Sequence, residues 1–195
     1  MKIRNGFVSN SSSSSFLVVF DKTPESVEEL YNMMFPIECV VQCSTDEAMD
    51  SHEIAEYIYN LIQVRKIKMK PIQKHEFFQF VDMGWFPGYP NSTDFHKKSS
   101  SIALEYHTKF KHSILDKKAD KEWVEKFKKV SQKEEEEYKQ VRKEKLQEFV
   151  NNKWDIFKNK VCCSINLSDN ENNEEAFLEH NDIFRNLPHI TVNHH

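Results

Sequence analysis

The chain has 195 residues, of which 38% are hydrophobic and 12% aromatic, and its net charge is -4 at pH 7. Its length predicts one domain, and its aromatic content exceeds that of disordered chains, so we expect a packed core. The negative charge argues against nucleic-acid binding by the protein surface as a whole, so that only binding through a local basic patch remains an option.

Glycine content, cysteine spacing and apolar runs bear on further classes of protein and of binding site. The 3 glycines are too few for a P-loop or a GxGxxG dinucleotide loop, whose backbones need glycine to approach phosphate closely. The 4 cysteines, Cys39, Cys43, Cys162 and Cys163, are expected to be reduced thiols of a cytosol-like compartment, and a zinc site built from them stays an open alternative. The sequence shows no apolar run suited to a bilayer span or a signal peptide, so we expect a soluble intracellular protein.

The first elements are predicted to be a strand, a helix and a second strand. Phe16–Phe20 is a short apolar run rich in valine and phenylalanine, which is typical of a buried strand. Thr23 suits the N-cap of the helix that follows, and Pro24 suits its first position. Ile37–Gln42 reads as the second strand, and this order suggests a βαβ-like unit.

A second helix and a basic segment come next. Ser51–Val64 carries apolar residues at helical spacing. The segment after it is rich in lysine and contains no acidic residue, which makes a candidate nucleic-acid patch of four residues: Arg65, Lys66, Lys68 and Lys70. The alternative is a solvated loop or an edge strand, because lysine discourages edge-to-edge pairing.

The middle of the chain is predicted to contain two strands around an aromatic loop. Phe77–Val81 and Ser101–Thr108 are the two strands, the second because its apolar residues alternate. Between them, Trp85, Phe86 and Tyr89 lie on a loop broken by glycine and proline. These rings could line a ligand pocket or an interface, or fold down onto the core.

A long charged helix is predicted from about 120 to 158, where neither glycine nor proline occurs. Between Lys117 and Lys160 there are 14 Lys or Arg and 10 Asp or Glu, a net charge of +4. Such an intermixed helix is typical of a surface or of an arm that pairs with another helix. The remaining elements are a strand at Val161–Leu167, a short helix at Glu174–His180 and a strand at His189–Asn193.

Together these elements predict the fold class and its organisation. We expect a single α/β (α+β) domain over residues 1–195, with a small mixed sheet, flanking helices and one long charged helix that forms an arm at about 120–158.

The two ends of the chain resemble a known group of proteins. The start contains RNGFVSNSSSSSF followed by an ESVEEL helix, and the end reads EHNDIFRNLPHITVNHH. Both resemble uncharacterised proteins encoded by tailed bacteriophages and by some bacterial genomes. The resemblance covers about the first 35 and the last 17 residues. It implies a phage or prophage setting, with the host cytoplasm as the expected location and virion association left open, and it implies no reaction.

The serine run near the start is a candidate for binding an anion or a partner. Asn10, Ser11, Ser12 and Ser13 would present amides and hydroxyls on a loop. A flexible structural loop and a serine nucleophile are the alternatives. Several equivalent serines argue against a nucleophile, because catalysis needs one oriented side chain beside a base.

The histidine-rich end is the candidate metal site. Glu179, His180, His189 and His194 have the side chains that Zn²⁺, Mn²⁺ or Fe²⁺ accepts. An extended strand would separate the histidines at its two ends, so any site has to be completed by folding. Metal-free catalysis by a histidine and purely structural histidines stay open.

Three functions follow from these features. The first is a non-enzymatic phage accessory protein that acts through protein–protein contacts with a phage protein, a host protein or a second copy of itself. The second is a small metal-dependent hydrolase, a nuclease or phosphoesterase, in which the metal would activate a water. The third is a nucleic-acid binder that uses the basic segment after the second helix.

Overall fold

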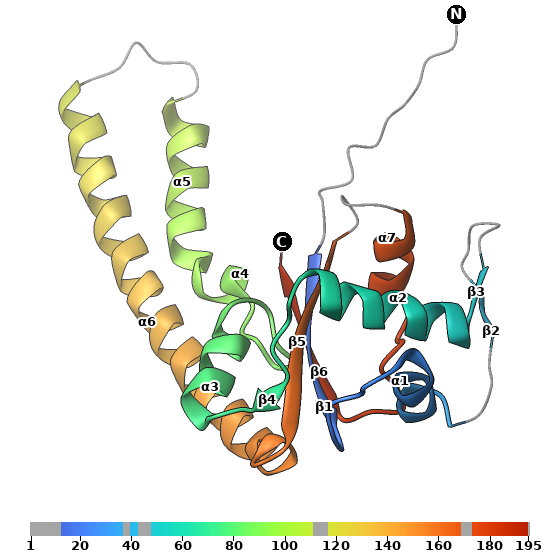
Figure 1. The fold of residues 1–195 in the computed structure, drawn as a ribbon. Coiled ribbons are helices and arrows are strands. Elements are labelled where there is room, and N and C mark those ends of the chain that lie inside the picture. The colour runs from blue at the N-terminus through green and yellow to red at the C-terminus, as the bar shows by residue number, and fades with distance from the viewer. Residues whose placement is uncertain (1–12, 37–39, 43–47, 111–116, 169–172, 195) are drawn as a thin grey trace, which may run out of the picture. The chain divides into compact units, whose positions relative to one another are not determined.

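The computed structural model describes most of the chain, in five stretches: residues 13–36, 40–42, 48–110, 117–168 and 173–194 (Figure 1). It divides into two compact units. The first consists of Met1–Phe86 with Val150–His195, and the second of Pro87–Phe149. The predicted α/β (α+β) class, with a small sheet, flanking helices and one long charged helix, is confirmed. The single domain stays a prediction.

The first unit is built around a four-stranded sheet with the strand order β4-β5-β1-β6. The strands are β4 (Lys70–Pro71), β5 (Val161–Ser168), β1 (Ser13–Phe20) and β6 (His189–His194). Every described pairing between them is antiparallel. β1 is central because it pairs with β5 on one side and with β6 on the other. The sheet therefore holds segments from both ends of the chain side by side, and the strands predicted late in the sequence are confirmed.

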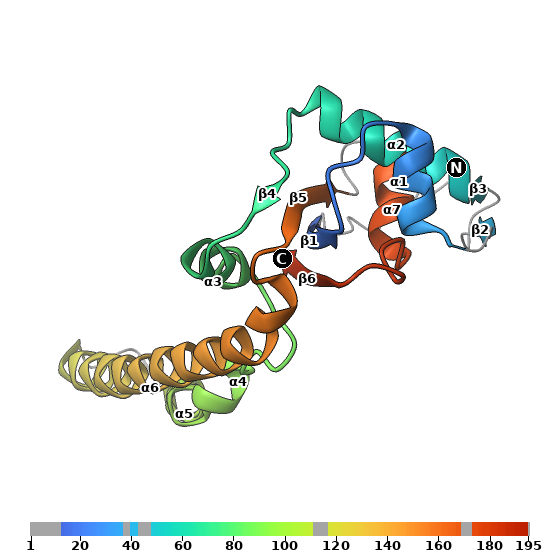
Figure 2. The ribbon, with the colours of Figure 1, turned by 60° about the horizontal axis from the view of Figure 1, so that its bottom comes forward.

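Three helices cover one face of this sheet, namely α1 (Val27–Met34), α2 (Ser51–Val64) and α7 (Asn173–His180) (Figure 2). The bounds predicted for the second helix are those of α2. Asp50 caps it by accepting hydrogen bonds from the backbone N–H groups of His52 and Glu53, while the Glu53 carboxylate accepts from the Asp50 N–H.

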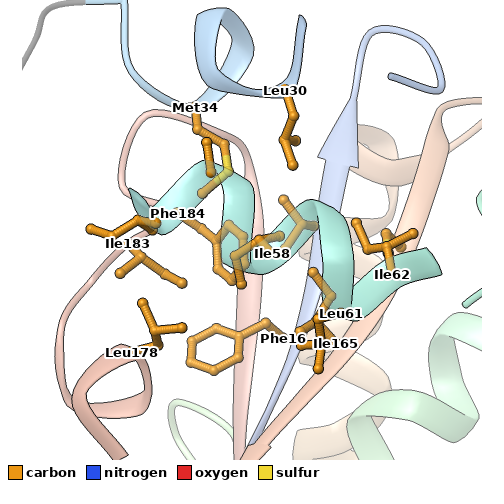
Figure 3. Packing of buried hydrophobic residues seen from close by; sticks show 14 of the residues in the cluster. Phe16, Leu30, Met34, Ile58, Leu61, Ile62, Ile165, Leu178, Ile183 and Phe184 are labelled. Carbon is orange, nitrogen blue, oxygen red and sulfur yellow. The ribbon is translucent and has the colours of Figure 1, made fainter. Parts of the chain in front are cut away.

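The core lies between these helices and the sheet. Its residues come from β1, β5, all three helices, the residue after α1 and the segment between α7 and β6, and Figure 3 shows how they point toward one another. The labelled members are Phe16, Leu30, Met34, Ile58, Leu61, Ile62, Ile165, Leu178, Ile183 and Phe184. Phe16 and Phe184 are in contact, with their ring centroids 5.3 Å apart.

The opposite face carries α3 (Lys74–Asp82), where a strand was predicted at Phe77–Val81. That prediction is wrong. Phe77, Phe80 and Val81 are all buried, and their three- and four-residue spacing is that of a helix. Phe77 stacks on Phe157, with ring centroids 4.8 Å apart, so tertiary packing decides the conformation of this short apolar run.

The start of the chain also differs from the prediction. β2 (Val40–Gln42) pairs antiparallel with β3 (Ala48–Asp50) in a separate two-stranded sheet, so the expected βαβ unit is wrong. α1 begins at Val27 because the Ser26 hydroxyl accepts a hydrogen bond from the Glu29 N–H at 3.2 Å. Thr23 and Pro24 therefore precede the helix.

The second unit is helical. It contains α4 (Ser92–Phe95), α5 (Lys97–Phe110) and most of α6 (Lys117–Phe157). α6 confirms the long charged helix, whereas the strand predicted at Ser101–Thr108 is wrong because this stretch lies within α5. In the described part of the chain, none of the helices combines the length and apolar character needed to cross a membrane.

The core of the first unit gives the first testable prediction. Ile58 is completely buried in α2, whereas Val64 at the end of the same helix is 79% exposed. Ile58→Ala should lower the free energy of unfolding by about 2–5 kcal/mol, because it removes buried apolar atoms and leaves a cavity. Val64→Ala should change it by less than about 0.5 kcal/mol. Equal losses for the two variants in urea unfolding would contradict the position of the core.

Candidate functional site

The two ends of the chain meet in a polar contact at one end of the sheet. The Ser14 hydroxyl lies 2.9 Å from the Glu179 Oε1 and 3.0 Å from the Asn193 side-chain oxygen. One hydroxyl proton can serve only one of these acceptors at a time, and a rotated Asn193 amide would instead donate to Ser14. The backbone N–H of Trp85 also holds Asn193, because it donates a hydrogen bond to the backbone carbonyl oxygen of Asn193 at 2.9 Å. Because Ser14 is buried, this contact joins the ends of the fold and does not present a nucleophile to solvent.

The serine run is only partly described. Asn10, Ser11 and Ser12 lie outside the described residues, so the predicted anion or partner site stays a prediction. Ser13 is the first residue of β1 and pairs with Ser168 and His194. At least this end of the run is therefore strand and not loop.

The candidate metal ligands do not all come together. His189 pairs with Val18 and His194 pairs with Ser13, so they lie at opposite ends of β6, roughly 17 Å apart at about 3.3 Å per residue. Glu179 lies near the His194 end through its contact with Ser14.

His189 has a separate set of contacts. One ring nitrogen lies 3.0 Å from the carbonyl oxygen of Leu187, and the other lies 3.4 Å from the Asp182 carboxylate. The structure does not describe the side chains of His180 and His194. Within the described residues, no group of three or more His, Cys, Asp or Glu could hold a metal ion. The geometry thus keeps His189 apart from Glu179.

Two of the four residues in the predicted basic patch after α2 are engaged in ion pairs, and the patch itself stays a prediction. Arg65 points inward: its guanidinium lies 2.5 Å from the Glu175 carboxylate and also donates to the Asn166 carbonyl at 2.9 Å. Lys70 is paired with Glu76 at 2.5 Å. Lys66 lines one surface groove, whereas Lys68 and Lys70 line another.

Glu175 is the most deeply buried acid in this part of the structure, with 2% of its surface exposed. Besides Arg65, it accepts hydrogen bonds from the Tyr57 hydroxyl at 3.3 Å and from the Ser168 N–H at 3.2 Å. The contacts of this carboxylate connect α2, β5 and α7. It is a structural ion pair in which both carboxylate oxygens accept hydrogen bonds, and sequence reasoning missed it because its members lie far apart in the chain.

The two described cysteines are buried on β5 and neither forms a disulfide. Cys163 belongs to the core, while Cys162 lines a groove on the other face, as their adjacent positions on a strand predict. Burial raises the pKa of Cys162 to about 11 and that of Cys163 to about 12. Both thiols are therefore protonated at neutral pH and are poor nucleophiles. Cys39 and Cys43 lie outside the described residues.

The three rings of the aromatic loop have different surroundings. Phe86 is buried, and Trp85 forms a backbone bridge to β6 while its side chain remains 46% exposed. Tyr89 belongs to the second unit, where its hydroxyl accepts a hydrogen bond from Arg142 at 2.8 Å.

An apolar groove lies between α5 and α6, which are side by side in the second unit (Figures 1 and 2). We call it the α5–α6 groove. Its volume is about 290 Å³, and almost all of its lining is apolar. It is lined by Ile102, Ala103, Tyr106, His107, Trp123, Val124, Phe127 and Lys128. Val124 is 47% and Phe127 38% exposed, so the apolar surface faces solvent.

A buried carboxylate fixes the start of α5 against α6. Glu134 of α6 accepts hydrogen bonds from the backbone N–H groups of Lys98 and Ser99, at 2.8 and 3.1 Å. These are N–H groups of the first helical turn, which have no partner within a helix, and a negative charge is favourable there. Further along, the rings of Phe95 and Tyr138 contact each other edge-on, with centroids 5.5 Å apart. The two walls of the groove are therefore held together at this end.

The sequence held a weak signal for the groove. Ile102 and Tyr106 are four residues apart, as are Trp123 and Phe127, which is the spacing of one helical face. The strand prediction for Ser101–Thr108 hid the first pair. Without the partner helix, the second pair could not be recognised as one wall of a groove.

Breaking the Arg65–Glu175 pair should destabilise the fold. Glu175→Ala leaves the guanidinium without its carboxylate at a largely buried site, so the free energy of unfolding should fall by about 3–5 kcal/mol. Glu174→Ala is the control, because the neighbouring side chain is exposed and should tolerate the change. Urea unfolding of both variants measures the difference, and a similar small loss for the two would mean that the buried pair contributes no specific stability.

The capping contact of Glu134 should make the stability of the helical unit depend on acid pH. The pKa of Glu134 lies below its ordinary value of 4.5, mainly because the Ser99 side chain forms a hydrogen bond to the carboxylate. The two backbone N–H groups also lower this pKa, whereas burial raises it. Because the folded-state pKa is lowered, the stabilisation is present above the ordinary pKa and is lost as the pH falls through the folded-state pKa.

Glu134→Gln should therefore lower the melting temperature at pH 7, and this deficit relative to the wild type should shrink as the pH falls below the ordinary pKa of 4.5. Glu136→Gln, on the exposed side of the same helix, should follow the wild type over the same pH range. Thermal unfolding followed by circular dichroism at several pH values checks this. A Glu134→Gln deficit that stays constant down to pH 3 would argue against the carboxylate charge as its cause.

No protein-family model matches this chain, and neither a curated protein nor a solved structure does. Function is therefore inferred from the contacts and exposed surfaces described above.

Proposed function

We propose that this chain is a non-enzymatic accessory protein of a bacteriophage or prophage, which acts in the host cell by binding another protein. The α5–α6 groove is the binding surface in this proposal. The phage setting rests on the resemblance of the two ends of the sequence, and the mode of action rests on the groove.

The observation that carries the proposal is the exposed apolar lining of the groove. Val124 and Phe127 lie on one wall and remain about half and more than a third exposed. Burying apolar surface contributes roughly 25 cal/mol per Å². A contiguous apolar groove on an otherwise charged helix pair is a feature typical of interaction sites. A partner that covers it would gain this free energy.

The remaining polar clusters support this choice over an enzyme. Ser14 and Glu179 contact each other in a partly buried position, Glu175 is paired with Arg65, and the two buried thiols are protonated at neutral pH. These contacts explain the polar residues as structural. The metal-dependent hydrolase stays the alternative proposal, but it would have to be built without His189, which lies at the far end of β6 from Glu179.

Site-specific photo-crosslinking in cells that naturally make the protein tests the proposal. A crosslinking amino acid at Val124 should give one major adduct with a distinct protein, because this position faces the partner. The same amino acid at Val64, which is more exposed but lies in α2, is the matched control and should give no such adduct.

The adduct then has to be reproduced with purified components. The partner should bind the wild type and the Val64→Glu variant alike, and should bind Val124→Glu at least tenfold more weakly. Equal adducts from Val64 and Val124, or equal binding by the two glutamate variants, would contradict the groove as the binding surface.

A further inference from the structure

The dimensions of the α5–α6 groove suit a third helix. Each wall covers six residues, Ile102–His107 on α5 and Trp123–Lys128 on α6. At 1.5 Å per residue, each wall is roughly 8 Å long, about one and a half helical turns. A helix that packs on two others lies about 8–10 Å from each and inserts side chains spaced three and four residues apart. The groove can therefore accept two or three apolar anchors from one helix.

The described helical segments beside the groove carry more lysine than acid. Segments 97–108 and 121–133 contain 7 lysines and 3 acidic residues, a net charge of +4, although the whole chain has a net charge of -4. Lys128 lines the groove itself, and the Lys126 ammonium lies 5.0 Å from the centre of the Trp123 ring. The groove thus combines an apolar lining, its floor, with lysine side chains beside it.

This charge argues against a second copy of the chain as the occupant. A twofold dimer would place the same surface against itself, so that the lysines of one groove would meet the lysines of the other. Like charges in such an interface are unfavourable and reduce the rate of association. A nucleic acid would satisfy the lysines and could stack bases on Trp123, but it would leave the aliphatic lining, such as Val124, without an apolar partner.

We infer that the α5–α6 groove binds an amphipathic helix of another protein, with apolar side chains on one face and acidic side chains beside them. This inference rests on the proposed function and adds the chemistry of the partner. The apolar face would cover Val124 and Phe127, and the acidic side chains would lie beside Lys128. Charge would guide the approach and the orientation, while the apolar contacts would set the lifetime of the complex.

Three fluorescent peptides of roughly 20 residues, long enough to form a helix, test the inference with the full-length protein. The first has leucines at helical spacing on one face and glutamates beside them. The second has lysines in place of the glutamates, and the third has serines in place of the leucines. Fluorescence anisotropy should show that the first binds at least tenfold more tightly than either of the others.

Variants of the protein locate the site. Val124→Glu, Phe127→Glu and Lys128→Glu should each weaken binding of the acidic peptide at least fivefold. Lys128→Glu should also improve binding of the lysine peptide, a change that local unfolding would not produce. Val64→Glu and Lys143→Glu are the controls and should stay within twofold, because one lies in α2 and the other about 22 Å further along α6 at 1.5 Å per residue.

Other results would overturn the inference. Equal binding of the acidic and lysine peptides would remove the role of charge, and equal binding of the serine peptide would remove the role of the apolar floor. A dimer in sedimentation that Val124→Glu dissociates would identify a second copy as the occupant. Tighter binding of a single-stranded DNA oligonucleotide, lost in Lys128→Glu, would identify a nucleic acid.

The outcome also separates this inference from the proposed function. A specific protein adduct at Val124 without any preference for the acidic peptide would leave the function standing and reject the acidic helix. The absence of an adduct at Val124 together with the absence of peptide binding would reject both.

Discussion

The first unit depends on the position of β1 between β5 and β6. Both edges of β1 are used by neighbouring strands, and Ser14 to Phe20 are buried, so the strand needs partners from late in the chain before its backbone groups are satisfied. This requirement explains part of the serine run. Ser14 and Ser15 are both buried, and the small Ser14 hydroxyl lies within hydrogen-bonding distance of Glu179 and Asn193.

α7 adds a second constraint at the same end of the sheet. Its two inward carboxylates, Glu175 and Glu179, are four residues apart and therefore lie on one face of the helix. The first contacts Arg65 and the Ser168 N–H, and the second contacts Ser14. A helix that docks through two polar contacts in this spacing has one favourable register, because a shift by one residue would leave buried charges without partners. We attribute the fixed position of α7 to this pair as much as to the burial of Leu178.

Local signals predicted the elements that carry them, and tertiary contacts decided the rest. α2 has an apolar stripe and a capping box within its own sequence, so its bounds were predictable, and the charged run of α6 contains no helix breaker. α3 and α5 were predicted as strands because short apolar runs fit both periodicities. α5 begins where Glu134 caps it, and that residue lies 35 positions beyond Ser99 in the sequence. The groove could not be predicted for the same reason, since it exists only once two separate helices are paired.

A pair of helices also explains why an apolar groove stays open. Two helices share a single seam, and side chains just beyond that seam, such as Val124 and Phe127, have no third helix in the described unit to cover them. Water contact with this surface is unfavourable, and a protein with such a surface tends to associate with itself. The lysines beside the groove counter that tendency, because the lysines of one copy would lie against those of another if two grooves met. The same lysines would therefore disfavour pairing of two grooves and favour the acidic helix that we propose as the partner.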